Sequence, residues 1–502
     1  MAPEIGTTPD GRVAFLVTRR LALCAGLLLV SGCAVGPNFR LPDLSAPVTY
    51  LAGSDATPGV VAAQQESLFW WQSVPDGKLR QLVEAVIAQN ADLESAEASV
   101  RVAQANAAVA RSAFFPTITG SFDASRQKIS QETSSALTSN ATMYSLHTAA
   151  LNISYAPDIF GGTRRAYESA TSLARAQSFQ RDALALTLAS NTAVAAVQEA
   201  SLQQQITVTR NMVQIQQQLL NLLNRQNAAG QISYADVAAQ ETALAQTRLL
   251  LPPLEKQLEQ NRNLLATLSG RFPAEAQLPS FALSDFRKLP AVPLTATGDL
   301  IRQRPDIRAA EARLQSANAQ IGVAIANRLP GITLSGQVGS SSSALDKLFN
   351  PGMGLWSVAG GVLQPIFDAG ALANRQEAAE EGMRQALADY RSTVLNAFQN
   401  VADALRALQA DEKSIRAAQT ATAAANRNLS LVRKQVESGQ VSAPALISAQ
   451  QAYLQTSLAL VQAQASRQAN VFALVQALGG GWWPPKDATV TVVAHDTEQD
   501  DG

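Results

Sequence analysis

The side chains that most often bind metals or act as nucleophiles are scarce in this sequence. Its 502 residues include only two cysteines, Cys24 and Cys33, and two histidines, His147 and His495. The sequence contains no Walker-type glycine–lysine loop, no Gly-x-Ser-x-Gly elbow and no paired-histidine motif. We therefore expect no enzyme activity, no cofactor and no metal site.

One cysteine has neighbours that suit a different chemistry. Two arginines precede an apolar run, residues 21–30, which is too short to span a bilayer and has the length of a signal-peptide core. Val30-Ser31-Gly32-Cys33 follows and resembles a bacterial lipobox. We predict that residues 1–32 are a lipoprotein signal peptide and that the thiol of Cys33 accepts a covalent lipid. An ordinary signal peptide with a chance cysteine is the alternative.

The residue after the cysteine bears on location. It is Ala34, whereas an aspartate there would resemble a signal for retention in the inner membrane. We therefore expect a lipid-anchored protein of the outer membrane that extends into the periplasm.

The charge balance excludes further classes of protein. With 39 basic and 40 acidic residues the net charge is −1, and only 16% of residues are charged, against about 25% in an average domain. No basic surplus exists to attract phosphates. We expect no nucleic-acid partner.

The rest of the chain contains one pattern twice. Asp92-Leu93 through Ala98 matches Asp306-Ile307 through Ala312, 214 positions later. Gly230-Gln231-Ile232-Ser233 matches Gly439-Gln440-Val441-Ser442, 209 positions later. We predict repeat 1 over residues 81–270 and repeat 2 over residues 298–478.

The segments outside the repeats are shorter. We assign residues 33–80 to a lipid-anchored N-terminal segment and belt, 271–297 to a linker, and 479–502 to a C-terminal tail.

Each repeat begins with a helical stretch that ends before a proline, and two strands follow. The periodicity then changes from 3.6 to 2, with apolar and polar residues alternating. The predicted strands cover residues 116–126, 148–157, 331–340 and 356–364. About ten residues with one apolar and one polar face is the length of a tilted membrane-spanning strand. A half-buried strand of a soluble sandwich has the same periodicity.

Each strand pair precedes an unusually long helical stretch. Residues 163–229 contain no proline or glycine, and residues 371–438 contain only Gly382. At about 1.5 Å per residue, each would form a helix on the order of 100 Å long. Returning helices are predicted over residues 233–268 and 442–478, with Pro252-Pro253 breaking the first.

The number of strands argues for more than one chain. A transmembrane sheet must close, because its edge hydrogen-bond groups cannot face lipid. Four strands cannot close, eight would be filled by side chains, and twelve from three chains would leave an aqueous lumen. A soluble periplasmic coiled coil would explain the long helices but neither the strands nor the lipobox.

At this point the sequence resembles the outer-membrane efflux lipoproteins of the NodT type, relatives of TolC and OprM. Five motifs in order along the chain carry the resemblance: Cys33 to Phe39, Phe69-Trp70-Trp71, Gln303 to Glu311, Pro365 to Gly370, and Ala477 to Trp482.

The resemblance implies a mainly α fold with transmembrane β-strands. This is a duplicated, TolC-like, homotrimeric channel with a 12-stranded outer-membrane β-barrel and a long periplasmic α-helical barrel. It implies a passive gated duct for drugs or toxic compounds, as in multidrug resistance. The implied partners are a periplasmic adaptor, an inner-membrane pump, usually of the resistance-nodulation-division class, and outer-membrane lipid.

The resemblance also assigns roles near the helix tips. It implies that the two hairpins contact the adaptor, although a glycine and a serine there also simply reverse the chain. The adaptor-contact residues are Gly230, Gln231, Ile232, Ser233, Gly439, Gln440, Val441 and Ser442. The gate candidates, which could equally be solvated helix ends, are Arg225, Arg433, Lys434 and Glu437.

Two other functions remain open from the sequence. One is a conduit of the same fold for a type I protein exporter or a metal exporter. The other is a structural periplasmic lipoprotein without a pore.

Overall fold

A computed structural model describes residues 34–42, 70–73, 77–128, 130, 142–286, 303–438 and 440–480. The predicted signal peptide, Cys33, His495, Gly439 and the tail beyond residue 480 lie outside these ranges. So do residues 287–297 of the predicted linker and residues 298–302 of predicted repeat 2.

The described residues form two compact units. The first, here called the sheet unit, contains the residues up to Pro42, Val100–Ala176 and Ala310–Tyr390. The second, here called the helical unit, contains the described parts of Asp43–Ser99, Gln177–Ala309 and Arg391 onwards.

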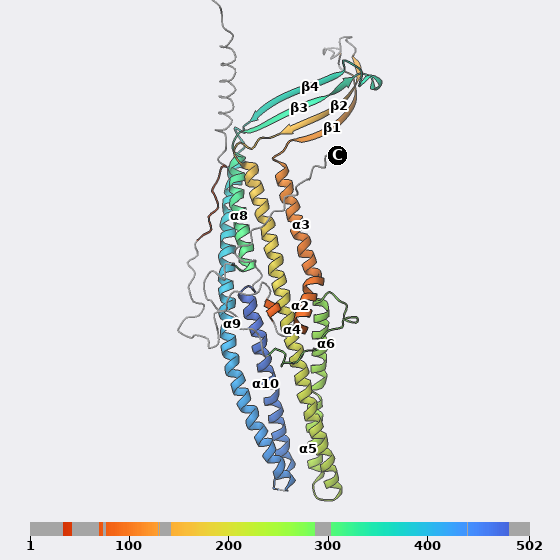
Figure 1. The fold of residues 1–502 in the computed structure, drawn as a ribbon, viewed down its shortest axis with the longest axis vertical. Coiled ribbons are helices and arrows are strands. Elements are labelled where there is room, and N and C mark those ends of the chain that lie inside the picture. The colour runs from red at the N-terminus through yellow and green to blue at the C-terminus, as the bar shows by residue number, and fades with distance from the viewer. Residues whose placement is uncertain are drawn as a thin grey trace, which may run out of the picture. The chain divides into compact units, whose positions relative to one another are not determined.

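The sheet unit contains one four-stranded antiparallel sheet in the order β1-β2-β3-β4 (Figure 1). The strands are β1 (Thr117–Lys128), β2 (Met143–Tyr155), β3 (Gly331–Ser342) and β4 (Gly354–Leu363). Strand β2 begins five residues before its predicted start. The prediction missed these residues because the alternation of polar and apolar residues reverses over residues 144–147. Strands β1 and β4 are the two edges of the sheet.

The register of the sheet places its apolar side chains on one face. Ile153 pairs with Ile118 on one side and with Gly336 on the other, and Val338 pairs with Leu151 and Trp356. Paired residues share a face, and alternate residues along a strand return to it. The exposed members of this apolar face are Ile118, Phe122, Leu151, Ile153, Leu334, Val338, Trp356, Val358 and Val362.

The opposite face of the sheet is polar. The side-chain amide of Asn152 donates to the hydroxyl of Ser121 at 3.2 Å, and the hydroxyls of Thr148 and Ser341 lie 3.0 Å apart. The polar residues on this face include Thr119, Ser121, Asp123, Thr148, Asn152, Ser335, Gln337, Ser341 and Ser357. Over the described strands the sheet therefore has one apolar face and one polar face.

The two long helices have the same length. Helices α4 (Gly162–Ala228) and α9 (Ala371–Glu437) each contain 67 residues, so each is about 100 Å long. Each begins after an aspartate that accepts two backbone N–H groups. Asp158 accepts from Thr163 and Arg164, both at 2.9 Å.

The second aspartate acts in the same way. Asp368 accepts the N–H groups of Gly370 at 3.0 Å and Leu372 at 2.7 Å. The hydrogen bond from Leu372 is the main reason that the pKa of Asp368 lies below its usual value. Both carboxylates satisfy N–H groups that would otherwise lack a partner at a helix start.

One division of the shorter helices was not predicted, and the other is the break predicted at Pro252-Pro253. The first helical stretch is divided at Asn90 into α2 (Gly77–Gln89) and α3 (Ala91–Ser112). The first returning stretch is divided into α5 (Tyr234–Arg248) and α6 (Leu251–Leu268).

In repeat 2, α8 (Pro305–Ala326) corresponds to α3, and α10 (Ala443–Ala477) is the undivided counterpart of α5 and α6. Two short 3₁₀ turns, Trp70–Ser73 and Leu345–Lys347, are also present in the described ranges. None of the helices in the described ranges combines the length and apolarity needed to cross a membrane.

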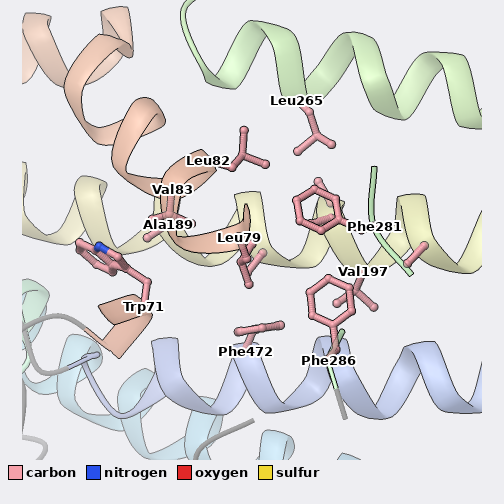
Figure 2. Close-up of a cluster of buried hydrophobic side chains, with 14 of the residues drawn as sticks. Trp71, Leu79, Leu82, Val83, Ala189, Val197, Leu265, Phe281, Phe286 and Phe472 are labelled. Carbon is pink, nitrogen blue, oxygen red and sulfur yellow. The ribbon is translucent and has the colours of Figure 1, made fainter. Parts of the chain in front are cut away.

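The largest hydrophobic cluster of the helical unit joins segments from both repeats (Figure 2). Trp71 and α2 residues such as Leu79 pack with α4, Phe281 and Phe286, and Phe472 of α10. The rings of Phe286 and Phe472 meet edge to face, 6.4 Å between centroids. This core fixes the middle of α4 against the ends of the returning helices.

Candidate functional site: helix tips and repeat junctions

The first hairpin tip ends α4 with a turn that requires a left-handed residue. Gly230 has φ +66°, its N–H donates to the Asn227 carbonyl, and the N–H of Gln231 donates to the Gln226 carbonyl, both at 2.9 Å. These two bonds make a Schellman motif. A Cβ at Gly230 would meet no atom within 4 Å, so the glycine is needed here for its backbone angle and leaves the tip open.

The returning helix of this tip is capped by a side chain. Ser233 accepts the N–H of Asp236 at 3.4 Å and donates to the carboxylate of Asp236 at 2.8 Å. Asn227 donates across the turn to the carbonyl of Ile232 at 2.9 Å. Gln231 and Ser233 are exposed, while Ile232 is half-buried against the hairpin core. The tip is thus a rigid turn with a polar outer surface.

The second tip repeats one backbone hydrogen bond of the first and has a different cap. The N–H of Gln440 donates to the Gln435 carbonyl at 2.8 Å, the same six-to-one bond as at the first tip. Ser442 precedes α10 but its side chain makes no capping hydrogen bond. Gln440 and Ser442 are exposed and Val441 is half-buried.

The two tips lie side by side. Ala443, at the start of α10, is buried in one cluster with α4 and α5 residues: Leu220, Leu223, Val237 and Leu244. The structure therefore brings together the described residues of both predicted adaptor-contact hairpins.

The gate candidates occupy exposed helix ends. Arg225, Arg433 and Lys434 are all exposed. Arg225 Nε donates to the backbone carbonyl of Asn221, one turn earlier on the same helix, at 3.2 Å. Glu437 is the last residue of α9.

Sequence reasoning missed a pair of matching contacts where the repeats begin. Asn90, only 6% exposed, caps α3 by accepting the N–H of Leu93 at 3.1 Å. Its amide also donates to the carbonyl of Leu268, at the end of α6, at 3.0 Å. Asn90 therefore ties the start of one helix to the end of another.

Repeat 2 makes the corresponding contact with an arginine. Arg304 lies 214 positions after Asn90, and Ala477 lies 209 positions after Leu268, the same two offsets that relate the repeats. The buried guanidinium of Arg304 donates to the Ala477 carbonyl and pairs with Asp306 at 2.7 and 3.0 Å. We call these two contacts the repeat junctions. Their only signal in the sequence was the offset itself.

A buried carboxylate was also missed. The Glu199 side chain, in α4, has no exposed surface, and its Oε2 atom has no hydrogen-bond partner. Its Oε1 accepts from Gln203 at 2.9 Å and from Arg262 at 3.3 Å. Burial raises the pKa of Glu199, against the opposing effect of Arg262.

Comparison with known proteins matches both repeats to one family model. Residues 82–271 and 297–480 match the model described as outer membrane efflux protein. Among curated relatives, the pyoverdine export outer membrane protein OpmQ of Pseudomonas putida is 30% identical over 82% of this chain and 88% of its own length. Nodulation protein T of Rhizobium leguminosarum bv. trifolii is 30% identical over 91% of this chain and 96% of its own.

Solved structures agree with these relatives. The outer-membrane channel OprN is similar with a TM-score of 0.81 and 28% identity, over 90% of this chain and 100% of that one. CusC, whose crystal structures are described in terms of folding and transmembrane channel formation, is similar with a TM-score of 0.78 and 25% identity. That likeness covers 89% of this chain and 100% of CusC.

Proposed function

Because this chain belongs to the outer membrane efflux protein family, we propose that it is the outer-membrane duct of a three-part efflux system. A periplasmic adaptor and an inner-membrane pump of the resistance-nodulation-division class would deliver small molecules to it. The family match and the channel-like fold confirm the predicted family, fold class and outer-membrane location. The duct itself would carry out no covalent chemistry.

The two-faced sheet is the observation that carries this proposal. Its apolar face suits lipid and its polar face suits water, as a membrane-spanning wall requires. Its edge strands β1 and β4 carry hydrogen-bond groups that need partners in a bilayer. Three copies, joined β4 to β1, would satisfy these groups with twelve strands and enclose a lumen.

We assign the membrane anchor to a lipid on Cys33. The lipobox-like sequence before that residue supports the assignment, as does the outer-membrane location of the family. Replacement by serine, Cys33→Ser, should remove the lipid mass from the purified mature chain. A mature chain of unlipidated mass in the wild type would contradict the anchor without affecting the duct.

The paired hairpin tips are the proposed adaptor contact. They are adjacent, mostly polar outside, and held by backbone hydrogen bonds at both turns and by the Ser233 cap at the first, so they offer a preformed surface. Exchanging the exposed tip residues Gln231 and Gln440 together for tryptophan should abolish dye efflux and adaptor cross-linking in cells, while the oligomer mass stays that of the wild type. Normal efflux in this variant would overturn the adaptor role of the tips.

We further propose that the exposed cations near the tips help to close the periplasmic end. The double variant Arg225→Ala and Arg433→Ala should then raise single-channel conductance. The control is the double variant Arg416→Ala and Arg427→Ala. Both residues lie on α9, the helix that also carries Arg433, but farther from its end. Equal conductance in all three proteins would count against the gate residues.

A further inference from the structure

The residues that follow position 33 run through a narrow site in the sheet unit. They form neither helix nor strand, yet they are held at both ends. The N–H of Val35 donates to the carbonyl of Phe160 at 3.0 Å, and Asn318 Nδ2 donates to the carbonyl of Pro37 at 2.9 Å. Phe160 precedes α4 in repeat 1, whereas Asn318 lies in α8 of repeat 2.

A buried arginine donates hydrogen bonds to the backbone of this segment. Arg165, whose side chain is only 6% exposed, donates to the carbonyls of Val35 at 3.2 Å and Gly36 at 3.3 Å. It also donates to the side chain of Asn38 at 2.8 Å and pairs with Glu168 at 2.8 Å. Three of its four described partners are in the N-terminal segment. Without that segment the buried guanidinium would lose most of its hydrogen bonds, which is costly.

Three glycines allow the close approach. A Cβ at Gly161 would lie 2.5 Å from the Ala34 Cα, and a Cβ at Gly36 would lie 2.6 Å from the Gly322 Cα. A Cβ at Gly322 would lie 2.7 Å from Arg165 Cγ and 2.8 Å from the Val35 carbonyl oxygen. Gly36 and Gly161 also have φ of +91° and +78°, which other residues rarely adopt. The site therefore fits this backbone and leaves no room for a side chain at any of the three positions.

The helices on either side of the site are themselves packed through small polar residues. The hydroxyls of Ser169 in α4 and Ser316 in α8 lie 2.8 Å apart, and Gln320 donates to Ser169 at 2.7 Å. The segment thus lies where the first and second repeats already touch.

We propose that residues 34–38 are an internal ligand that staples α4 of repeat 1 to α8 of repeat 2. Their binding site is made by Gly161, Arg165, Asn318 and Gly322. The residue at position 33 is then attached to the folded sheet unit and not to a free tether, because consecutive Cα atoms are only about 3.8 Å apart.

This inference rests on the proposed function in one respect. If Cys33 carries a lipid, the staple attaches the residue next to that lipid, Ala34, to the sheet unit. The staple itself requires only the contacts of residues 34–38.

A reporter cysteine tests the staple directly. In Val35→Cys the only other thiol of the mature chain is Cys33, since Cys24 lies in the predicted signal peptide. Purified oligomers would be treated with a maleimide and the labelling rate followed by mass. Adding Gly322→Ala, which pushes on Val35 and Arg165, should speed labelling of the reporter at least about tenfold, because each 1.4 kcal/mol lost from the docked state gives a factor of ten.

The matched control is a second glycine inside a helix of the same unit. A Cβ at Gly382, in α9, would meet nothing within 4 Å, so Gly382→Ala should leave the labelling rate unchanged. Arg165→Gln leaves α8 intact and should also speed labelling, with Arg165→Lys intermediate. Equal rates in the Gly322→Ala, Arg165→Gln and Gly382→Ala backgrounds would overturn the staple.

The same experiment separates the staple from the lipid. Maleimide labelling of the wild-type chain, which has no reporter, would show a free Cys33 and contradict the proposed acylation. The rate differences among the reporter variants would still decide on the staple.

Discussion

In repeat 1 the returning helix is bent at Pro252-Pro253 into α5 and α6, whereas in repeat 2 the same stretch is the single helix α10. The bend is gentle in backbone terms, because Leu249 and Leu250 keep right-handed helical angles. Proline lacks the N–H for the carbonyl four residues earlier and its ring presses on that carbonyl. The repeats therefore share an arrangement while differing in how stiff the returning strut is.

The buried positions differ in chemistry more than in geometry. The repeat junctions use neutral Asn90 in one copy and charged Arg304 in the other, each bonded to the carbonyl that ends a returning helix. In the long helices, Glu199 of α4 corresponds to Leu408 of α9, 209 positions later, and Leu408 packs against an apolar cluster. The two repeat junctions therefore keep the same contact and differ in the side chain that makes it.

The largest effect should come from giving α10 the bend of its counterpart. Gln462 corresponds to Pro253 and is exposed, and its side chain donates to Gln205 at 3.5 Å. The difference between Gln462→Pro and Gln462→Ala therefore tests the backbone alone. We expect Gln462→Pro to lower the free energy of unfolding by about 3 kcal/mol or more, because proline removes a backbone hydrogen bond inside α10. Thermal unfolding in detergent, with Gln462→Ala as the control, measures it. Equal midpoints for the two variants would show that both repeats tolerate the bend.

The repeat junctions should come next. Arg304→Met keeps an aliphatic stem but leaves the Ala477 carbonyl without its charged donor, and should cost about 2 to 3 kcal/mol. Asn90→Ala removes a helix cap and a neutral bond and should cost about 1 to 2 kcal/mol. Unfolding midpoints should fall in that order. The reverse order would mean that the charge of Arg304 adds nothing to its junction.

Much of this architecture can be predicted from the sequence. The repeat junctions show which contacts cannot. Prolines, glycines and the change of period mark the strands and the ends of both long helices, because these signals are local. Asn90 looks like one more polar residue in an alanine-rich helix, and its role depends on Leu268, far along the chain. The early start of β2 was hidden because Tyr144 and Leu146 stand on the polar face.

The contacts of the staple could not be predicted from the sequence either. Gly322 in the middle of a helical stretch was a signal of close packing, since glycine weakens a helix. Its partners Gly36 and Arg165 lie in other segments and become visible only in the fold. The sequence thus predicts elements well and long-range polar contacts poorly.

The Glu199 site should give a smaller, pH-dependent effect. A carboxyl whose folded pKa is raised above its ordinary 4.5 binds its proton more tightly when folded, so its contribution to stability falls as pH rises through the raised value. Glu199→Gln should therefore stabilise the protein by about 1 kcal/mol at pH 8 and by less near pH 5. Unfolding midpoints at the two pH values measure this. A gain that does not change with pH would exclude the ionisation of Glu199 as its cause.

The smallest difference should separate the two tips. Ser233→Ala removes a capping hydrogen bond and should cost about 1 kcal/mol, whereas Ser442→Ala removes none and should change stability by no more than a few tenths. Hydrogen exchange of the first turns of α5 and α10 compares them. Equal protection loss at both tips would contradict the difference in caps.

We propose above that three copies of this chain form one duct. Its most direct test is the oligomer mass of the purified protein in detergent, together with single-channel conductance of the same sample in a planar bilayer. We expect a trimer with small, fluctuating conductance, as a closed but gated duct would give. A monomer or dimer without conductance would contradict it.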